Sequence, residues 1–235
     1  MTTKCPFHSS TAAPPPALDL SNLPPRIAAL QQRRGFPVPW FVEIVEDDYD
    51  FRVMSATKLV RAVRQDLCWV CGQRLGRHRA FVIGPMCGVN RTNAEPPSHV
   101  DCAQFAAQYC PFLSIAHMKR REDAMTEAAA ENVAGLGLRR NPGVCAVWVV
   151  SAPGYRIFAD HQNRPLFEIA QPERVLWYAE GRAASLDEVL ESVRTGEPLL
   201  RAACEKEATE DRRLEAHQEL TRRLDAFTLY LGLQP

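Results

Sequence analysis

The chain has 235 residues, of which 46% are hydrophobic and 24% charged, and its 28 lysines and arginines balance 28 aspartates and glutamates. This composition is typical of a soluble globular protein and excludes a chain that is disordered throughout. At about 150 residues per domain, the length predicts one or two domains, which can bury a core without disulfide bonds.

Membrane-spanning and secretory segments are not expected. No window of about 18 apolar residues is uninterrupted, since the longest uncharged stretch, residues 141–155, contains two prolines and two glycines. The N-terminus lacks the apolar centre of a secretory signal peptide. We therefore expect a cytoplasmic protein whose eight cysteines stay reduced, and reduced cysteines separated by two residues favour metal binding.

Residues 1–25 predict a flexible arm. They contain six prolines, each of which lacks an amide donor and disfavours helix in the residue before it. Cys5 and His8 have the spacing of a metal-ligand pair, but the arm offers no second pair. We therefore interpret this spacing as incidental.

The N-terminal region, residues 26–135, should become ordered near Ile27. Two apolar runs, residues 40–45 and 50–53, flank an acidic turn and predict two short strands. Ser55 can cap a helix that follows them. The apolar face of this helix has helical spacing and consists of Leu59, Val60 and Val63.

Two pairs of metal-ligating residues, separated by 27 residues, lie in the centre of this region. The first is Cys68-Trp69-Val70-Cys71-Gly72, in which two residues separate the cysteines and a glycine permits a tight turn. The second is His99 and Cys102, which have the same separation. Each pair can turn both of its ligand atoms toward one ion.

The segment between the two pairs predicts a β-hairpin, because residues 80–83 and 86–89 are apolar runs on either side of Gly84-Pro85. The second ligand pair should open a helix. Two prolines precede it, Ser98 can cap it, and apolar residues follow at helical spacing, namely Phe105, Ala106 and Tyr109.

After this segment the chain predicts one more helix and then strands. Residues 118–133 are rich in charge and alanine and end at a glycine-containing stop signal, residues 135–137. A second region, residues 136–235, then begins. Its first half predicts an antiparallel β-meander from four β-rich runs, which are residues 144–150, 155–158, 166–169 and 175–178.

The second half of this region predicts C-terminal helices, the first of which starts at a capping box formed by Ser185 and Glu188. A later apolar stripe predicts core packing more than a coiled-coil dimer, which needs about three or four sustained heptads. The oligomeric state stays open. The stripe consists of Leu220, Leu224, Phe227 and Leu231, extended by Leu214 and His217.

The order of a two-cysteine knuckle, a hairpin and a helix that returns two ligands resembles a treble-clef zinc finger. The resemblance spans about residues 66–112 and implies one structural zinc ion. The donor set agrees, since three thiolates and one imidazole suit tetrahedral zinc and leave no open position for water. The predicted ligands are Cys68, Cys71, His99 and Cys102.

Two alternatives to this ligand set stay open. Cys87 in the predicted hairpin can replace His99, or the four residues are ordinary buried side chains without a metal ion. The remaining cysteines of the folded part lie on apolar faces and are expected to be buried as small hydrophobic residues. These are Cys110, Cys145 and Cys204.

Local charge is unbalanced around the predicted metal module. Residues 51–121 contain eleven basic and three acidic residues, a net charge of plus eight. A rigid basic module suits nucleic-acid phosphates, which supply most non-specific affinity for DNA and RNA. We predict phosphate contacts from Arg74, Arg77, Arg79 and Arg91. The alternative is a solvated basic face that pairs with the acidic C-terminal residues Glu205, Glu207, Glu210 and Asp211.

Catalytic motifs are scarce: the chain has no Gly-rich phosphate loop, no G-x-S-x-G and no HExxH. The module resembles HNH endonucleases in part, and His78 lies where their general base would lie. However, no aspartate precedes His78, and His99 is assigned to zinc. Asn90 and Asn93 resemble the asparagine in the middle of that family's motif. A nuclease that uses His78 is therefore a minor alternative.

The sequence CWVCGQRLGRHRAFVIGPMCGVNRTNAEPPSHVDCAQFAAQYCPFL also resembles a segment of uncharacterised bacteriophage and prophage proteins. The likeness covers about residues 36–200 and implies a phage or mobile-element origin, but it implies no activity. A second functional hypothesis is therefore an accessory protein that binds a host or phage protein.

Together these features predict an α+β protein, in which a treble-clef zinc module packs against an antiparallel β-meander and C-terminal helices. The function we expect from the sequence is non-enzymatic, zinc-stabilised binding of DNA or RNA, with no membrane partner.

Overall fold

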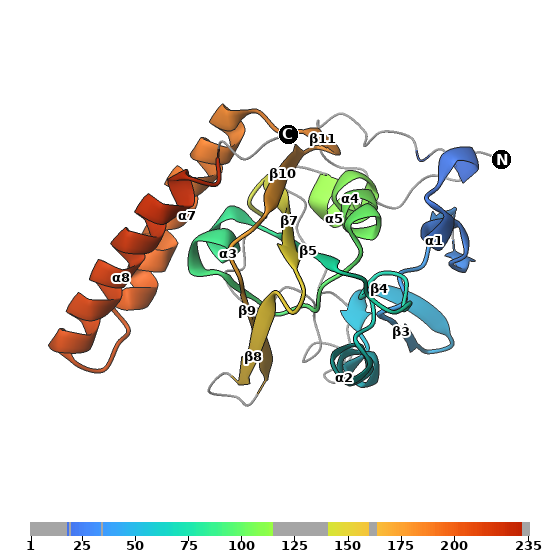
Figure 1. Ribbon diagram of the computed structural model, residues 1–235, viewed down its shortest axis with the longest axis horizontal. Coiled ribbons are helices and arrows are strands. Elements are labelled where there is room, and N and C mark those ends of the chain that lie inside the picture. Colours follow the sequence, from blue (N-terminus) through green and yellow to red (C-terminus); the bar gives the residue numbers. More distant parts are fainter. Residues whose placement is uncertain (1–17, 19, 34, 115–140, 160–163, 232–235) are drawn as a thin grey trace.

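The computed structural model describes residues 18, 20–33, 35–114, 141–159 and 164–231 (Figure 1). It contains helices and antiparallel sheets, which confirms the α+β class. Cys5, His8 and the helix predicted for residues 118–133 lie outside the described residues. No helix among the described residues has both the length and the apolar composition of a membrane span.

The N-terminal part of the chain is built from short elements. Ordered structure begins before the predicted Ile27, since a 3-10 helix and α1 already occupy part of the predicted arm. The two strands and the helix predicted around Ser55 are confirmed. The elements are η1 (Leu20–Asn22), α1 (Pro25–Ala28), β1 (Gln32–Arg33), β2 (Phe36–Pro37), β3 (Val42–Val45), β4 (Asp48–Met54) and α2 (Ala56–Gln65).

The centre of the molecule is a four-stranded antiparallel sheet with the order β11-β10-β7-β5. β7 is buried over nearly its whole length because helices cover both faces of the sheet (Figure 1). Trp148 and Phe81 pack toward α3, α7 and α8, whereas Ala80 and Val149 pack toward α4 and α5. The strands are β5 (His78–Ile83), β7 (Val144–Ser151), β10 (Arg174–Ala179) and β11 (Arg182–Ala183).

The predicted hairpin between the ligand pairs is wrong. β5 forms, but the second apolar run lies in helix α3 (Pro85–Asn90), and β5 pairs with β7 from far along the sequence. Pro85 occupies the start of α3, where its fixed φ and missing amide donor favour a helix. The hairpin predicted for residues 80–89 is therefore absent from the described residues.

The predicted single meander is also wrong, although its four strands all form. β7 and β10 belong to the central sheet, whereas β8 (Tyr155–Ala159) and β9 (Pro165–Ile169) join β6 (Thr92–Asn93) in a second sheet. The chain turns out of β7 at Gly154, whose φ of +65° and close approach to Val150 favour glycine. This turn separates the two sheets.

The predicted C-terminal helices are confirmed as α7 (Leu186–Cys204) and α8 (Glu210–Thr228), joined by α4 (Val100–Tyr109) and α5 (Pro111–Ser114) in covering the central sheet. The Leu220 and Phe227 side chains are buried in the main core, which confirms core packing of the stripe. Leu214 is 59% exposed and does not extend it, and His217 bonds to Glu205.

The start of α7 has the predicted capping box. The Ser185 hydroxyl accepts a hydrogen bond from the Glu188 amide at 3.3 Å, and the Ser185 amide donates to the Glu188 carboxylate at 2.8 Å. Replacing Ser185 with alanine should therefore lower the free energy of unfolding by about 1 kcal/mol, the ordinary cost of losing an N-cap. Urea unfolding at neutral pH measures this loss, and an unchanged midpoint would contradict the cap.

The same box predicts a pH dependence of stability. Hydrogen bonds from Arg182 and from the Ser185 amide lower the pKa of Glu188 from 4.5 to about 2. Because the folded state favours the carboxylate, this stabilisation is complete above pH 4.5 and is lost as the pH falls toward 2. Glu188→Gln should remove this pH-dependent part of the free energy of unfolding, which a series of unfolding curves at decreasing pH measures. The contributions of other titrating groups should stay as in the wild type.

Candidate metal centre

The first ligand pair lies in a tight turn directly after α2. The Cys68 amide donates to the Gln73 carbonyl at 2.7 Å, and the Gly72 amide donates to the Cys68 carbonyl at 2.8 Å. Gly72 has a φ of +72°, and a Cβ there would lie 2.6 Å from Cγ of Trp40. Both conformation and packing therefore require glycine after the second cysteine, as the sequence motif indicates.

The second ligand pair is held beside β5 by backbone pairing. Ala80 and Ser98 exchange two hydrogen bonds of 2.8 Å each, so the chain returns next to the knuckle just before His99. His99 itself, one residue later than predicted, is the N-cap of α4. Cys102 therefore lies in the first turn of α4, on the same side of the module as the knuckle.

The structure brings together the four predicted ligands. All four residues are buried, and their ligand atoms lie within 4.8 Å of one another. Nδ1 of His99 lies 3.4 Å from Sγ of Cys71 and 3.9 Å from Sγ of Cys102. Ordinary bond lengths of about 2.3 Å to sulfur and 2.1 Å to nitrogen place such atoms about 3.6 Å apart around a tetrahedral ion. The cluster is thus compatible with one metal ion.

Neighbouring groups orient the ligand atoms. Nε2 of His99 lies 3.0 Å from the Arg74 carbonyl, which can accept only from a protonated nitrogen, so Nδ1 is directed at the thiols. The amides of Cys71 and His99 donate to Sγ of Cys68 at 3.5 and 3.3 Å. Amide donors of this kind favour the thiolate form that a metal ion requires.

The four side chains of the cluster also interact electrostatically with one another. Burial opposes the negative charge on Cys68, but hydrogen bonds with Cys102, Cys71 and His99 lower the pKa of its thiol. The hydrogen bonds of His99 with Cys68 and Cys71 raise the pKa of the imidazole to about 10.

The N-terminal segment closes the cluster against solvent. Ile27 of α1 is fully buried in the same apolar cluster as Cys68 and Cys102. Arg26 donates to the Asp101 carboxylate at 2.8 Å and so joins α1 to the first turn of α4. This packing leaves the ligands shielded, as expected of a metal site that stabilises a fold rather than one that binds substrate.

The Cys87 alternative is wrong. Cys87 lies in α3, where it packs against the main core, and it is not part of the ligand cluster. Burial raises the pKa of its thiol to about 11 and keeps it neutral. Cys145 is buried as predicted, and burial raises its pKa to about 12. Cys110 and Cys204 are only half-buried.

The four predicted phosphate-binding arginines have different environments. Arg74 and Arg77 are exposed and flank the stretch that leads from the knuckle to β5. Arg91 caps the end of α3 instead, on the side of α8, where it contributes to the lowered pKa of Glu219. The structure therefore does not place all four on one surface.

Arg79 is a correction to the sequence prediction. Its side chain is 11% exposed and donates to the Asp66 carboxylate at 2.7 Å, and its guanidinium lies 5.6 Å from the ring centre of Tyr155. It is therefore not available to a phosphate. The missed signal was strand alternation, because Arg79 and the core residue Phe81 share one face of β5.

His78, the residue of the nuclease alternative, is exposed at the start of β5. Its Nδ1 lies 3.1 Å from the Glu173 carboxylate, which also accepts a hydrogen bond from Ser151. Among the described residues, the cluster around Cys68 is the one group of three or more metal-ligating side chains that can reach a single ion. His78 therefore has no metal site beside it in this part of the chain.

Comparisons with protein-family models, with curated proteins and with solved structures find no match to this chain.

The ligand cluster predicts a measurable metal dependence. The purified protein should contain about one metal ion per chain, and Cys68→Ala should lose it, since three remaining ligands no longer enclose the ion. Loss of even about 3 kcal/mol of metal-binding free energy lowers the Tm of a chain this long by roughly 6–12 °C. Elemental analysis and thermal melting with a chelator measure both effects.

The matched control is Cys204→Ala, which removes a half-buried thiol outside the cluster. It should keep the metal ion and its response to chelation. Equal metal content in the two variants would show that Cys68 is not a ligand.

Proposed function

We propose that this chain is a zinc-stabilised, non-enzymatic protein that binds nucleic-acid phosphates. The observation that carries the proposal is the buried cluster of three cysteines and one histidine, which offers four donor atoms within 4.8 Å of one another. Soft thiolates with an imidazole favour zinc over calcium or magnesium. Four protein ligands leave no position for a reacting water, so the role of the ion is structural.

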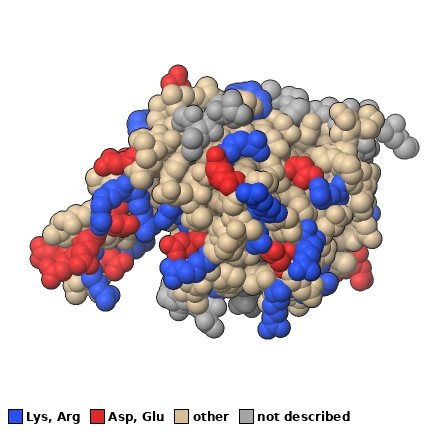
Figure 2. Space-filling view, in the orientation of Figure 1, with Lys and Arg blue, Asp and Glu red and all other residues tan. Residues whose placement is uncertain are grey.

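The candidate binding surface lies on α2 and the knuckle, and we call it the α2–knuckle face. It consists of Arg61, Arg64, Arg74 and Arg77, all of which are exposed. Backbone bridging between Leu67 and Arg74 places the end of α2 beside the loop after the knuckle. Basic side chains lie over α2 at the lower edge of the space-filling view (Figure 2).

This face keeps its positive charge. Arg64, Arg74 and Arg77 form no ion pair with any described residue, and the nearby Asp66 carboxylate is already paired with Arg79. Arg77 interacts electrostatically with the Glu173 carboxylate but forms no direct ion pair with it. Exposed guanidinium groups outside ion pairs are suited to phosphate oxygens, which they bind through charge-assisted hydrogen bonds.

Aromatic packing connects the α2–knuckle face to the Cys/His cluster. The Trp40 ring covers Gly72 of the knuckle, and the Arg61 guanidinium lies 5.7 Å from the centre of that ring. Phe41 stacks on Trp69, which lies between the two ligand cysteines, at a centroid distance of 5.0 Å. A disordered knuckle would therefore also displace α2 and its arginines.

The acidic residues lie elsewhere. Glu205, Glu207, Glu210 and Asp211 surround the turn between α7 and α8, which projects from the opposite side of the molecule (Figures 1 and 2). No ion pair joins this turn to the α2–knuckle face among the residues that the structure describes. The acidic turn thus does not neutralise the basic face, which favours an external anionic partner for that face.

A salt titration tests this proposal. Fluorescence anisotropy with labelled single- and double-stranded oligonucleotides should show binding that weakens linearly as log K against log salt concentration. Arg74→Gln combined with Arg77→Gln should weaken binding and reduce the slope by about 0.7–0.9 for each phosphate that the variant no longer neutralises.

The matched control for this titration is Arg194→Gln combined with Arg222→Gln, which removes the same charge from α7 and α8. Its slope should stay that of the wild type. No binding at low salt, or equal slopes in the two double variants, would refute the proposal.

A further inference from the structure

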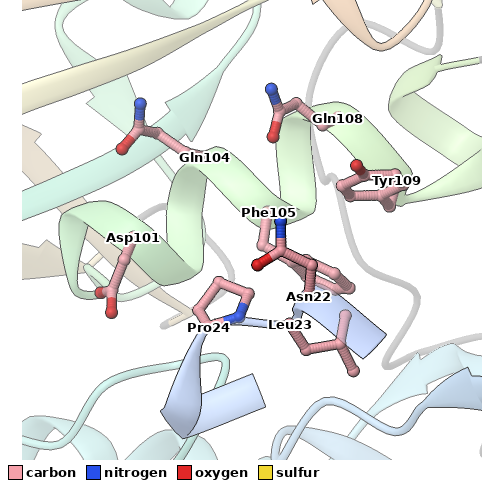
Figure 3. Close-up of a pocket in the computed structure, with 8 residues that line it drawn as sticks. All are labelled: Asn22, Leu23, Pro24, Asp101, Gln104, Phe105, Gln108 and Tyr109. Atoms are coloured by element: carbon pink, nitrogen blue, oxygen red, sulfur yellow. The ribbon is translucent and has the colours of Figure 1, made fainter. Parts of the chain in front are cut away.

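A groove that the metal centre does not use lies between α4 and the segment that leads into α1 (Figure 3). Its volume is about 420 Å³. Asn22 and Pro24 line it from the N-terminal segment, and Phe105 and Tyr109 line it from α4. The groove therefore joins the beginning of the described chain to the helix that carries Cys102.

The walls of the groove are aromatic and, apart from Asp101 at one end, uncharged. The rings of Phe105 and Tyr109 lie 5.1 Å apart between centroids and are tilted by 33°, which makes a continuous apolar surface. The carboxylate of Asp101, at one end, is paired with Arg26 at 2.8 Å. A phosphate or another anion would meet this carboxylate without a free cation beside it, so the groove does not suit nucleic acid.

Hydrogen-bonding groups along the groove are available to a ligand. The side-chain amides of Asn22 and Gln108 and the hydroxyl of Tyr109 form no hydrogen bond with any described residue. The neighbouring amide of Gln104, in contrast, donates to the Tyr178 hydroxyl at 3.2 Å. The groove thus offers three donors beside an aromatic surface, and it matches a ligand rich in carbonyl acceptors and poor in amide donors.

Proline-rich segments have this chemistry. Proline has no amide donor, its carbonyls are exposed in a polyproline II helix, and such helices dock on aromatic-lined grooves. The chain carries such a segment itself, since Pro14-Pro15-Pro16 lies within residues 5–18, a stretch without lysine, arginine, aspartate or glutamate. The one charged side chain among the described residues that line the groove, Asp101, is already paired with Arg26, so an uncharged segment suits the groove.

The connection between Pro16 and the N-terminal end of the groove is long enough for the proline segment to bind in the same molecule. Four peptide units join Pro16 to Leu20, where η1 begins, and can span up to about 14 Å. The groove follows α4 from Asp101 to Tyr109, which corresponds to about 12 Å of helix. Four residues of polyproline II helix, at about 3.1 Å each, cover the same length.

We propose that the segment around Pro14-Pro15-Pro16 binds as a polyproline II helix in the groove between α4 and Asn22 of the same chain. The short connection gives the segment an effective concentration in the millimolar range, so weak contacts suffice. This contact would cover the groove and brace α1, whose Arg26 and Ile27 pack against the metal module.

Nuclear magnetic resonance on the full-length, metal-loaded chain tests the proposal. Pro14→Ser, Pro15→Ser and Pro16→Ser are combined in one variant, and Pro6→Ser is the matched control in the same arm. We expect the triple variant to shift the Gln108 side-chain amide and the Tyr109 ring signals, and the control to leave them unchanged. Tyr109→Ala should in turn shift the signals of residues 13–17.

Two further measurements decide the source of the ligand. A synthetic peptide of residues 9–18, added to the triple variant at millimolar concentration, should move the Gln108 signal back toward its wild-type position. The wild-type signals should not change on dilution, because the contact is within one chain. Identical spectra of wild type and triple variant, or no response to the peptide, would refute the proposal, and concentration-dependent signals would assign the contact to a second copy instead.

Discussion

Backbone hydrogen bonds attach the segment before His99 both to β5 and to the knuckle, and so bring the four ligand side chains together. Ala80 and Ser98 exchange two of these bonds, and the Trp69 amide donates to the Pro97 carbonyl at 3.1 Å. The knuckle and the second ligand pair are separated by the whole of β5, α3 and β6, so nothing local brings them together. The Ala80–Ser98 bridge attaches the returning chain to the edge of the central sheet and thereby fixes where α4 begins. A metal ion would then close the same connection through side chains, in a region whose apolar cluster is small.

Packing and ion pairs connect this cluster to two surfaces of the molecule. On one side, Trp40, Gly72 and Trp69 connect the ligands to α2 and its exposed arginines. On the other side, Arg26 and Ile27 connect them to α1 and the groove along α4. The Cys/His cluster thus lies between a surface of exposed arginines and a largely aromatic groove. The arginines Arg64, Arg74 and Arg77 of the first surface are outside ion pairs with the described residues.

Local sequence signals predicted the four residues of the Cys/His cluster and most individual elements. The two-residue spacings at Cys68 and His99 and the capping box at Ser185 are short-range patterns whose chemistry does not depend on distant residues. Alternation and β-rich composition likewise identified β7, β8, β9 and β10. The side chains that these patterns placed on one face of α8, Leu220 and Phe227, are indeed in the core.

Long-range pairing and short apolar runs could not be predicted in this way. Residues 86–89 are apolar enough for a strand, and periodicity over so few residues cannot distinguish a strand from a buried helix such as α3. The partner of β5 is β7, far along the chain, and no local pattern specifies that register. Arg79 was assigned to the surface by its charge, whereas its position in β5 directs it toward Asp66 and Tyr155.

The central claim is that one zinc ion is bound by three sulfur atoms and one imidazole nitrogen. X-ray absorption spectroscopy at the zinc edge of the purified protein tests this claim most directly. The account predicts a first shell of three sulfur atoms at about 2.3 Å and one nitrogen at about 2.0–2.1 Å, with imidazole scattering that disappears in His99→Cys. A shell of oxygen and nitrogen atoms alone, or four sulfur atoms in the wild type, would contradict it.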